Sequence, residues 1–206
     1  MEQYIKGLIK ERCGALKAIE DFATENKVPI VQKETAVFLE FLTSMKKPLK
    51  ILELGTAIGY SSILMYEAAG TKPEITTIER DERMIEYATK NLESFNLSNK
   101  IKIKKGDCLE ILENLEEEFD LIFMDAGKGH YNHFLPHCLR LLKEDGIIVA
   151  DNVLFRGMVA SDDLVKRRKI TIVKRMRSYL DLVTKDEKLI TSVIPMGDGI
   201  AVTKRR

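Results

Sequence analysis

The chain is organised around twelve residues, Ile51-Leu52-Glu53-Leu54-Gly55-Thr56-Ala57-Ile58-Gly59-Tyr60-Ser61-Ser62. A short apolar run ends in an acid, two glycines punctuate the turn that follows, and a second apolar run begins with helical spacing. This pattern predicts a strand that leads through a loop into a helix. Glycines let such a loop approach a ligand closely, and the helix offers free N–H groups at the positive end of its dipole.

The loop lacks the motifs of ordinary nucleotide-binding loops. It contains neither Gly-x-Gly-x-x-Gly nor Gly-Lys-Ser/Thr, and Glu53 would repel a pyrophosphate at the strand end. A second acid, Glu79, ends the next strand-like run and suits a ribose diol, because a carboxylate accepts hydrogen bonds from both hydroxyls. An adenosine with a cationic, phosphate-free tail fits better than NAD, which indicates S-adenosylmethionine (SAM).

Strand and helix signals alternate along the rest of the chain. The expected helices cover residues 2–26, 32–45, 61–69, 81–96, 108–115, 131–142 and 164–182. The expected strands cover residues 50–53, 75–79, 101–105, 119–125, 146–151, 188–195 and 199–203. This order predicts an α/β fold with a doubly wound, mainly parallel sheet, an antiparallel C-terminal pair and ligands at the carboxyl ends of the strands.

Length and composition are those of one domain. The chain has 206 residues, of which 45% are hydrophobic, so we expect a single domain over 1–206, with a helical extension at 1–48 and a Rossmann-like core at 49–206. No apolar run approaches the roughly 20 residues of a membrane span, and no signal-peptide pattern begins the chain. Three widely spaced cysteines, at 13, 108 and 138, favour neither disulfides nor zinc. These features predict a cytoplasmic protein without a membrane partner.

Five acids lie at or just beyond the carboxyl ends of predicted strands: Glu53, Glu79, Asp107, Asp125 and Asp151. Any one of them could simply cap the next helix, but five at this edge indicate a ligand site. Asp125, Asp151 and Asn152 together supply two carboxylates and an amide oxygen, which suit Mg²⁺ or Mn²⁺. The alternative is that Asp151-Asn152 only forms a turn.

The glycine stretch resembles that of the metal-dependent O-methyltransferases of the catechol and caffeoyl-CoA type, as do Phe123-Met124-Asp125-Ala126-Gly127-Lys128 and Asp151-Asn152-Val153-Leu154. The resemblance covers about residues 29–203, with the motifs in the family's order. It implies a Rossmann-like, SAM-dependent O-methyltransferase in which Asp125, Asp151 and Asn152 bind the metal and Lys128 is the general base. A lysine beside a divalent cation has its ammonium form disfavoured, whereas a solvated loop lysine is the plain alternative.

The same resemblance implies the cofactor contacts, which are Val31, Glu53, Gly55, Ser61, Glu79, Asp107, Cys108 and Asp125. The first four contact the methionine, Glu79 holds the ribose, Asp107 and Cys108 flank the adenine, and Asp125 also receives the ammonium group. The N-terminal extension would cover the active site and join the contacts of a homodimer.

The C-terminal part of the chain is basic. Residues 166–206 contain 12 Lys/Arg and 4 Asp/Glu although the whole chain has a net charge of +1. No acid interrupts the cations Lys166, Arg167, Arg168, Lys169, Lys174, Arg175 and Arg177. A charge run is usually a solvated face, but beside an active site it favours phosphate binding. Phe155 and Arg156 are expected to stack on a planar base.

Within the family, the chain most resembles the bacterial tRNA 5-hydroxyuridine methyltransferases, which make 5-methoxyuridine at the anticodon wobble position. 5-Hydroxyuridine has vicinal oxygens and so mimics a catechol, and the basic run and the loop at 127–131 favour tRNA as the partner. Gly127 replaces the second acid of the commoner Asp-Ala-Asp-Lys form, which weakens the case for a small catechol. The alternatives are a small-molecule catechol or hydroxycinnamoyl-CoA methyltransferase, and a non-catalytic RNA-binding protein of the same fold.

Two further features are interpreted as structural. His130, His133 and His137 share one helix face but cannot close around one ion, so they are expected to be surface or half-buried histidines. Asp198 is interpreted as part of a turn between the last two strands, without a catalytic role.

Overall fold

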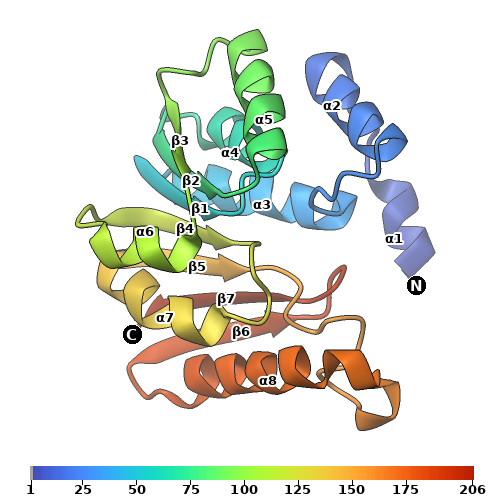
Figure 1. The fold of residues 1–206 in the computed structure, drawn as a ribbon, viewed down its shortest axis with the longest axis vertical. Coiled ribbons are helices and arrows are strands. Elements are labelled where there is room, and N and C mark those ends of the chain that lie inside the picture. Colours follow the sequence, from blue (N-terminus) through green and yellow to red (C-terminus); the bar gives the residue numbers. More distant parts are fainter. Residues whose placement is uncertain (1) are drawn as a thin grey trace.

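The computed structural model describes residues 2–206, which form a seven-stranded sheet in the order β3-β2-β1-β4-β5-β7-β6 (Figure 1). The strands are β1 (Lys50–Leu54), β2 (Glu74–Glu79), β3 (Ile101–Lys105), β4 (Phe119–Met124), β5 (Leu142–Ala150), β6 (Leu189–Ile194) and β7 (Ile200–Arg205). Strands β1 to β5 pair in parallel, whereas β7 pairs antiparallel with both β5 and β6. The predicted doubly wound sheet with an antiparallel C-terminal pair is therefore confirmed.

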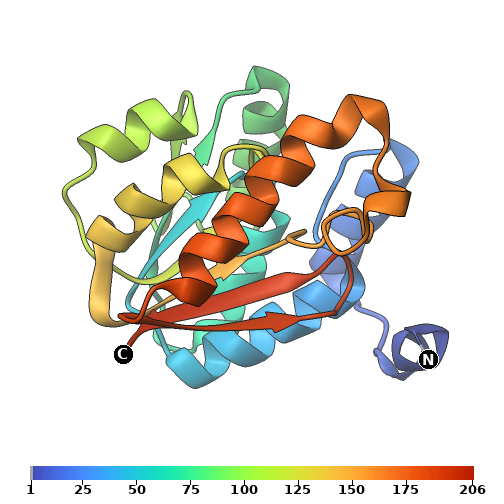
Figure 2. The ribbon, with the colours of Figure 1, turned by 90° about the horizontal axis from the view of Figure 1, so that it is seen from below.

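Helices cover both faces of this sheet. They are α1 (Glu2–Leu8), α2 (Gly14–Glu25), α3 (Lys33–Lys46), α4 (Tyr60–Ala69), α5 (Glu82–Ser94), α6 (Cys108–Asn114), α7 (Tyr131–Leu141) and α8 (Ile170–Lys185). Figure 2 shows α6, α7 and α8 on one side of the sheet and α3 on the other. No helix within residues 2–206 combines the length and the apolar character that crossing a bilayer requires.

Two expected helices were placed wrongly. The helix expected at 2–26 is divided, because Cys13 has extended backbone and Gly14 has φ of 64°, which ends the helical path between α1 and α2. The helix expected at 164–182 begins only at Ile170, after two short 3₁₀ turns at Asp162–Leu164 and Arg167–Lys169. The buried face of α8, which starts at Val173, supplies the packing that a stable helix needs.

The core forms one layer on each face of the sheet. Successive residues of β4 alternate between the layers, so Ile122 and Met124 pack with α6, α7 and α8, whereas Leu121 and Phe123 pack with α2, α3 and α4. The strand order reverses between β1 and β4, and the carboxyl ends of these strands are where an open α/β sheet binds ligands.

Candidate active site

The loops after β1 and β4 meet at this carboxyl edge. Gly55, directly after β1, has φ of 102°, a conformation that favours glycine. A Cβ atom at this position would lie 2.9 Å from the Cβ atom of Ala126, which follows β4. Gly55 therefore allows a close approach of two loops of the protein, while the predicted approach of this loop to a ligand stays a prediction.

The helix after the glycine loop begins without a side-chain cap. Gly59 precedes Tyr60 with φ of 82° and has no side chain that could bond the first-turn N–H groups of α4. These N–H groups lie at the positive end of the helix dipole, so they can bind an anion such as the carboxylate of methionine.

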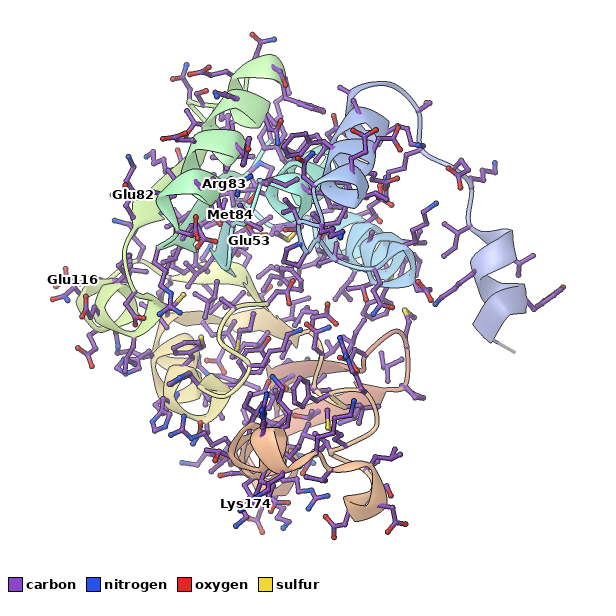
Figure 3. The ribbon with its side chains drawn as sticks, turned by 45° about the vertical axis from the view of Figure 1, so that its right-hand side comes forward. Glu53, Glu82, Arg83, Met84, Glu116 and Lys174 are labelled. Carbon is purple, nitrogen blue, oxygen red and sulfur yellow. The ribbon has the colours of Figure 1, made fainter. Side chains whose placement is uncertain are left out.

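Glu53 lies beneath the loop and is fully buried. Its carboxylate accepts hydrogen bonds from the hydroxyls of Ser61, Ser62 and Thr77, the last at 2.6 Å. Burial raises the pKa of Glu53, and the three hydroxyls oppose that rise. Figure 3 shows Glu53 inside the molecule. Glu53 and Ser61 therefore bind each other and tie α4 to β1 and β2, while their expected contacts with the cofactor stay predictions.

A cavity of about 270 Å³ lies between the loops that follow β2, β3 and β4. Its walls bring together the predicted Glu79, Asp107 and Cys108 with His130, which was interpreted only as a surface or half-buried histidine, and with Ala126 and Phe134, to which sequence reasoning gave no role. The rings of His130 and Phe134 lie 6.2 Å apart with an interplanar angle of 26°. Acids beside aromatic rings suit a nucleoside, because the acids accept ribose hydroxyls and the rings pack against the base. The sequence did contain a clue to Phe134, because it lies four residues after His130 and so on the same side of the helix.

Backbone groups hold the acids of this cavity. Glu79 accepts hydrogen bonds from the N–H groups of Ala57 at 3.0 Å and Arg80 at 2.9 Å. Asp107 caps α6 by accepting from the N–H of Leu109 at 2.9 Å. Burial and the charge of Asp107 raise the pKa of Cys108 to about 12. Asp107 therefore caps a helix, which was the alternative considered for each single acid, and it also lines the cavity.

The candidate metal ligands follow the adjacent strands β4 and β5. The N–H of Asp125 donates to Leu54 at 3.0 Å, and the N–H of Asp151 donates to Met124 at 3.0 Å. Tyr131, which sequence reasoning did not assign to the site, donates from its buried hydroxyl to the carbonyl oxygens of both Met124 and Asp151, at 2.9 and 3.1 Å. One phenol thus holds the ends of the two strands together.

The two carboxylates interact with each other and with Lys128. Burial raises the pKa of Asp125, the charge of Asp151 raises it further, and Lys128 lowers it. Burial likewise raises the pKa of Asp151, against the N–H of Asn152 and the charge of Lys128. Asp151 is buried and Asp125 is half-buried, and two carboxylates that interact in this way favour a further cation between them. Together with the Asn152 amide they would supply an all-oxygen donor set of the kind that suits Mg²⁺, and this metal site stays a prediction. Over residues 2–206 no group of three or more His, Cys, Asp or Glu gathers as a metal site.

The turn between β6 and β7 belongs to this site, although sequence reasoning gave Asp198 no role there. The turn itself is confirmed, and Asp198 accepts a hydrogen bond from the N–H of Arg156. Its carbonyl accepts from Leu154 at 2.9 Å, and its charge raises the pKa of Asp151. Asn152, at φ of 59°, lies in the loop that these contacts hold. The link joins segments more than 40 residues apart, which the local pattern could not indicate.

Three other expectations concern side chains around the site. His133 is exposed and His137 half-buried, as expected, while His130 is exposed at the cavity wall. Val31 is buried in the loop before α3, and its contact with the methionine stays a prediction. The expected stacking of Phe155 is wrong, because its ring is buried and Lys169 lies over it at 5.9 Å.

The seven cations of the basic run divide into two groups. Arg175 donates to Gly129 at 3.1 Å in the Lys128 loop, and Arg177 donates to Val159 and pairs with Asp162 at 2.8 Å. Arg175 and Arg177 therefore join segments of the protein to α8. The other five are exposed and form no salt bridge within residues 2–206: Lys166, Arg167, Arg168, Lys169 and Lys174. We call these five the basic surface; Figure 3 shows Lys174 on the outer side of α8.

Comparison with known proteins identifies the family. The O-methyltransferase family profile matches residues 11–206. A catechol O-methyltransferase of Niastella koreensis is 34% identical over 169 residues, which are 79% of this chain and 76% of that protein. A structure from Staphylococcus aureus, provisionally assigned as a caffeoyl-CoA O-methyltransferase, is 33% identical with a TM-score of 0.90 and covers 100% of this chain and 99% of that one.

A bound cofactor product is present in a further similar structure. The SAH-bound methyltransferase of Podospora anserina has a TM-score of 0.88 and 26% identity, covering 99% of this chain and 93% of that one. SAH, S-adenosylhomocysteine, is what remains of SAM after methyl transfer. This chain belongs to the O-methyltransferase family, and it is a SAM-dependent enzyme of the catechol and caffeoyl-CoA type.

Proposed function

We propose that this O-methyltransferase requires Mg²⁺ and methylates 5-hydroxyuridine at the wobble position of tRNA, giving 5-methoxyuridine. One observation carries the tRNA proposal. The basic surface has no internal acidic partner in the described chain, and Arg175 joins the helix that bears Lys174 to Gly129, next to Lys128. Phosphates are the ligands that unpaired surface cations favour.

Asp125, Asp151 and Asn152 would hold the cation, which supplies Lewis acidity to vicinal oxygens of the substrate when bound. Lys128 is close enough to both carboxylates to lower the pKa of each, so the proposed base lies at the same place as the proposed donor set. The substrate 5-hydroxyuridine offers two such vicinal oxygens on a planar ring.

The chemistry proposed for the chain's own residues is a single displacement. Lys128 Nζ takes the proton of the substrate hydroxyl. A bond forms between that oxygen and the methyl carbon as the bond from carbon to sulfur breaks, and SAH leaves as a neutral thioether. Glu79 and the first turn of α4 hold the two ends of the cofactor, so alignment supplies much of the rate.

A second candidate is a small-molecule substrate, either a catechol or a hydroxycinnamoyl-CoA ester. The names of the relatives favour it, because one is a catechol O-methyltransferase and others are caffeoyl-CoA O-methyltransferases. The phosphates of CoA would also bind the basic surface. A non-catalytic RNA-binding role is disfavoured, since the chain belongs to an enzyme family.

The deciding experiment compares methyl acceptors. Purified enzyme with labelled SAM and Mg²⁺ is offered tRNA that carries 5-hydroxyuridine, a simple catechol and a caffeoyl-CoA ester, each with and without chelator. We expect label in the tRNA that disappears with chelator. Label only in a small molecule would contradict the tRNA proposal, and label that resists chelator would contradict the metal proposal.

We also propose that the protein is a homodimer. Exposed apolar side chains lie on α3 and on the face of β6 that is on the α3 side of the sheet, namely Val37, Phe41, Met45 and Ile190. An apolar cavity of about 480 Å³ lies between α3 and the β6–β7 turn. Covering such a face with a second copy removes apolar surface from water. Light scattering coupled to size-exclusion chromatography is expected to give twice the chain mass of 23.5 kDa; a single-chain mass would contradict this proposal.

A further inference from the structure

A partly buried polar cluster outside the catalytic site joins the N-terminal segment to the cofactor loop. Its members are Arg12, between α1 and α2, Glu20 of α2, Glu40 of α3 and Tyr60, the first residue of α4. Arg12 donates from Nη1 and Nη2 to the two carboxylate oxygens of Glu40, each at 2.8 Å, and its Nε lies 3.2 Å from Glu20. Bidentate pairs of this kind impose a specific geometry.

Tyr60 is the cluster's connection to the site. Its ring is 2% exposed, and its hydroxyl donates to the carboxylate of Glu20 at 2.5 Å. The guanidinium of Arg12 lies 5.9 Å from the centre of the same ring. Burial raises the pKa of Tyr60 and the bond to Glu20 adds to the rise, so the hydroxyl keeps its proton and remains a donor.

Tyr60 stands between the two residues that shape the cofactor loop. Gly59 precedes it at φ of 82°, and Ser61 follows it with its hydroxyl on Glu53. The first turn of α4 is therefore held on one side by Glu53 and on the other by Glu20. A shift in either contact would move the uncapped N–H groups that can bind the methionine carboxylate.

The segment N-terminal to Arg12 forms few other ion pairs with the rest of the protein. Helix α1 extends away from the sheet in both ribbon views (Figure 1 and Figure 2). Among the described side chains, the ion pairs Lys6–Glu34 at 3.1 Å and Lys33–Glu11 at 2.8 Å join this region to α3. Lys33 and Glu11 are both exposed, and Lys6 is exposed although its partner Glu34 is buried. Ion pairs with exposed partners contribute little.

We propose that Glu20, Tyr60 and Arg12 are positioning residues for SAM, and that cofactor binding and the docking of residues 9–13 are one coupled equilibrium. Cofactor binding orders the first turn of α4 and so fixes Tyr60. The Tyr60 hydroxyl then holds Glu20 in place, and Glu20 binds Arg12. By linkage, docking of the segment strengthens cofactor binding by the same factor. The inference rests on SAM binding alone and is independent of the tRNA and metal proposals.

The first test measures SAH binding by calorimetry with the full chain. Tyr60→Phe removes one hydroxyl and keeps the ring, and we expect the Kd for SAH to rise about five- to tenfold, within the usual range of coupling between sites. Glu20→Gln is expected to act in the same direction. Asp21→Asn is the matched control, because Asp21 is the next residue on α2 and is exposed; its Kd should equal that of the wild type. A wild-type Kd for Tyr60→Phe would overturn the proposal.

The second test has a readout that general loss of stability would not reproduce. Trypsin can cut after Lys10 and Arg12, and SAH should slow the cut after Arg12 in the wild type and in Asp21→Asn. In Tyr60→Phe and Glu20→Gln the rate should no longer respond to saturating SAH, while circular dichroism confirms the fold. Equal protection by SAH in all four proteins would overturn the coupling, as would no protection in the wild type.

Discussion

Lys128, the proposed general base, has three properties that suit this role. It is half-buried, it lies in the loop directly after β4, and its charge acts on both Asp125 and Asp151. His133 and His137 lie further along α7, and His130 lines the cavity between the loops that follow β2, β3 and β4. Loss of one amine therefore tests the chemistry directly.

Lys128→Ala is expected to lower kcat about 10²- to 10⁴-fold, the range for a general base, while the Kd for SAH changes little. Initial rates and calorimetry measure the two quantities. Lys174→Ala is the control, because it removes the same charge from the outer side of α8 and should leave kcat for a small acceptor unchanged. A Lys128→Ala enzyme with nearly wild-type kcat would show that another group takes the proton.

The three cysteines should differ sharply in reactivity. Cys13 is exposed, Cys138 is buried, and Cys108 has a pKa raised to about 12. Because the thiolate is the nucleophile, iodoacetamide at about pH 7.5, below the ordinary thiol pKa, is expected to modify Cys13 quickly and the other two hardly at all. Mass spectrometry of peptides over time checks this. Rapid modification of Cys108 would contradict the burial of its thiol and its raised pKa.

At the level of elements, the site depends on how neighbouring loops and strand ends are joined. The β1 loop touches the β4 loop at Gly55, and Tyr131 of α7 bridges the ends of β4 and β5. At the other end of the sheet, Asp120 of β4 accepts from the N–H groups of Leu49 and Lys50 and from Lys143. Substitutions of Gly55 and Asp120 test these contacts between elements.

Gly55→Ala should destabilise the protein and weaken SAH binding, because the new methyl group meets Ala126 and the backbone is left-handed. Gly70→Ala is the matched control: its φ is 67°, but nothing lies within 4 Å of the added Cβ. We expect Gly70→Ala to cost about 1–2 kcal/mol from backbone strain alone, and Gly55→Ala to cost more. Urea unfolding measures both, and equal destabilisation would contradict the close contact of the loops.

Asp120 should give the protein a stability that depends on pH. Burial alone would raise its pKa, but Lys143 and the two backbone N–H groups together lower it below the ordinary value. The stabilisation is therefore present above the unfolded-state pKa of about 4 and is lost as pH falls through the lower folded-state pKa. Asp120→Asn should cost about 1–3 kcal/mol at neutral pH, and the difference from wild type should shrink towards about pH 3. A difference independent of pH would contradict this assignment.

At the level of the whole molecule, charge is separated between two regions. The basic surface lies on the α8 side, whereas the acids of the site lie at the carboxyl edge of the sheet. Arg175 and Arg177 look equivalent to the other five cations in the sequence, yet their partners are within the protein.

Replacing Lys166, Arg167, Lys169 and Lys174 with alanine is expected to weaken tRNA binding and to reduce its salt dependence. The log–log slope should fall by about 0.7–0.9 for each phosphate that the variant no longer neutralises. The rate with a simple catechol should not change. Filter binding at several salt concentrations measures the slope. A wild-type slope in this variant would exclude the basic surface as the region that binds tRNA.

The sequence by itself determined the order of the elements, the glycine loop and the row of acids at strand ends, because apolar periodicity and turn chemistry are local properties of the chain. From these alone the sheet, its antiparallel end and the place of Glu79, Asp107, Asp125 and Asp151 followed. The ends of helices followed less well: the chain leaves the α-helix over residues 9–13, before Gly14 with its positive φ, and it forms two short 3₁₀ turns before α8 begins.

Only the tertiary structure decided which side chain each polar group faces. Glu53 is enclosed by hydroxyls from α4 and β2, Asp198 reaches Arg156 across 42 residues, and Tyr60 meets Glu20 across 40. These contacts arise because packing places distant segments together, and a buried polar group must then find a partner wherever the fold supplies one. Local patterns carry no information about that choice, which is why the residues that position the site came into view only with the fold.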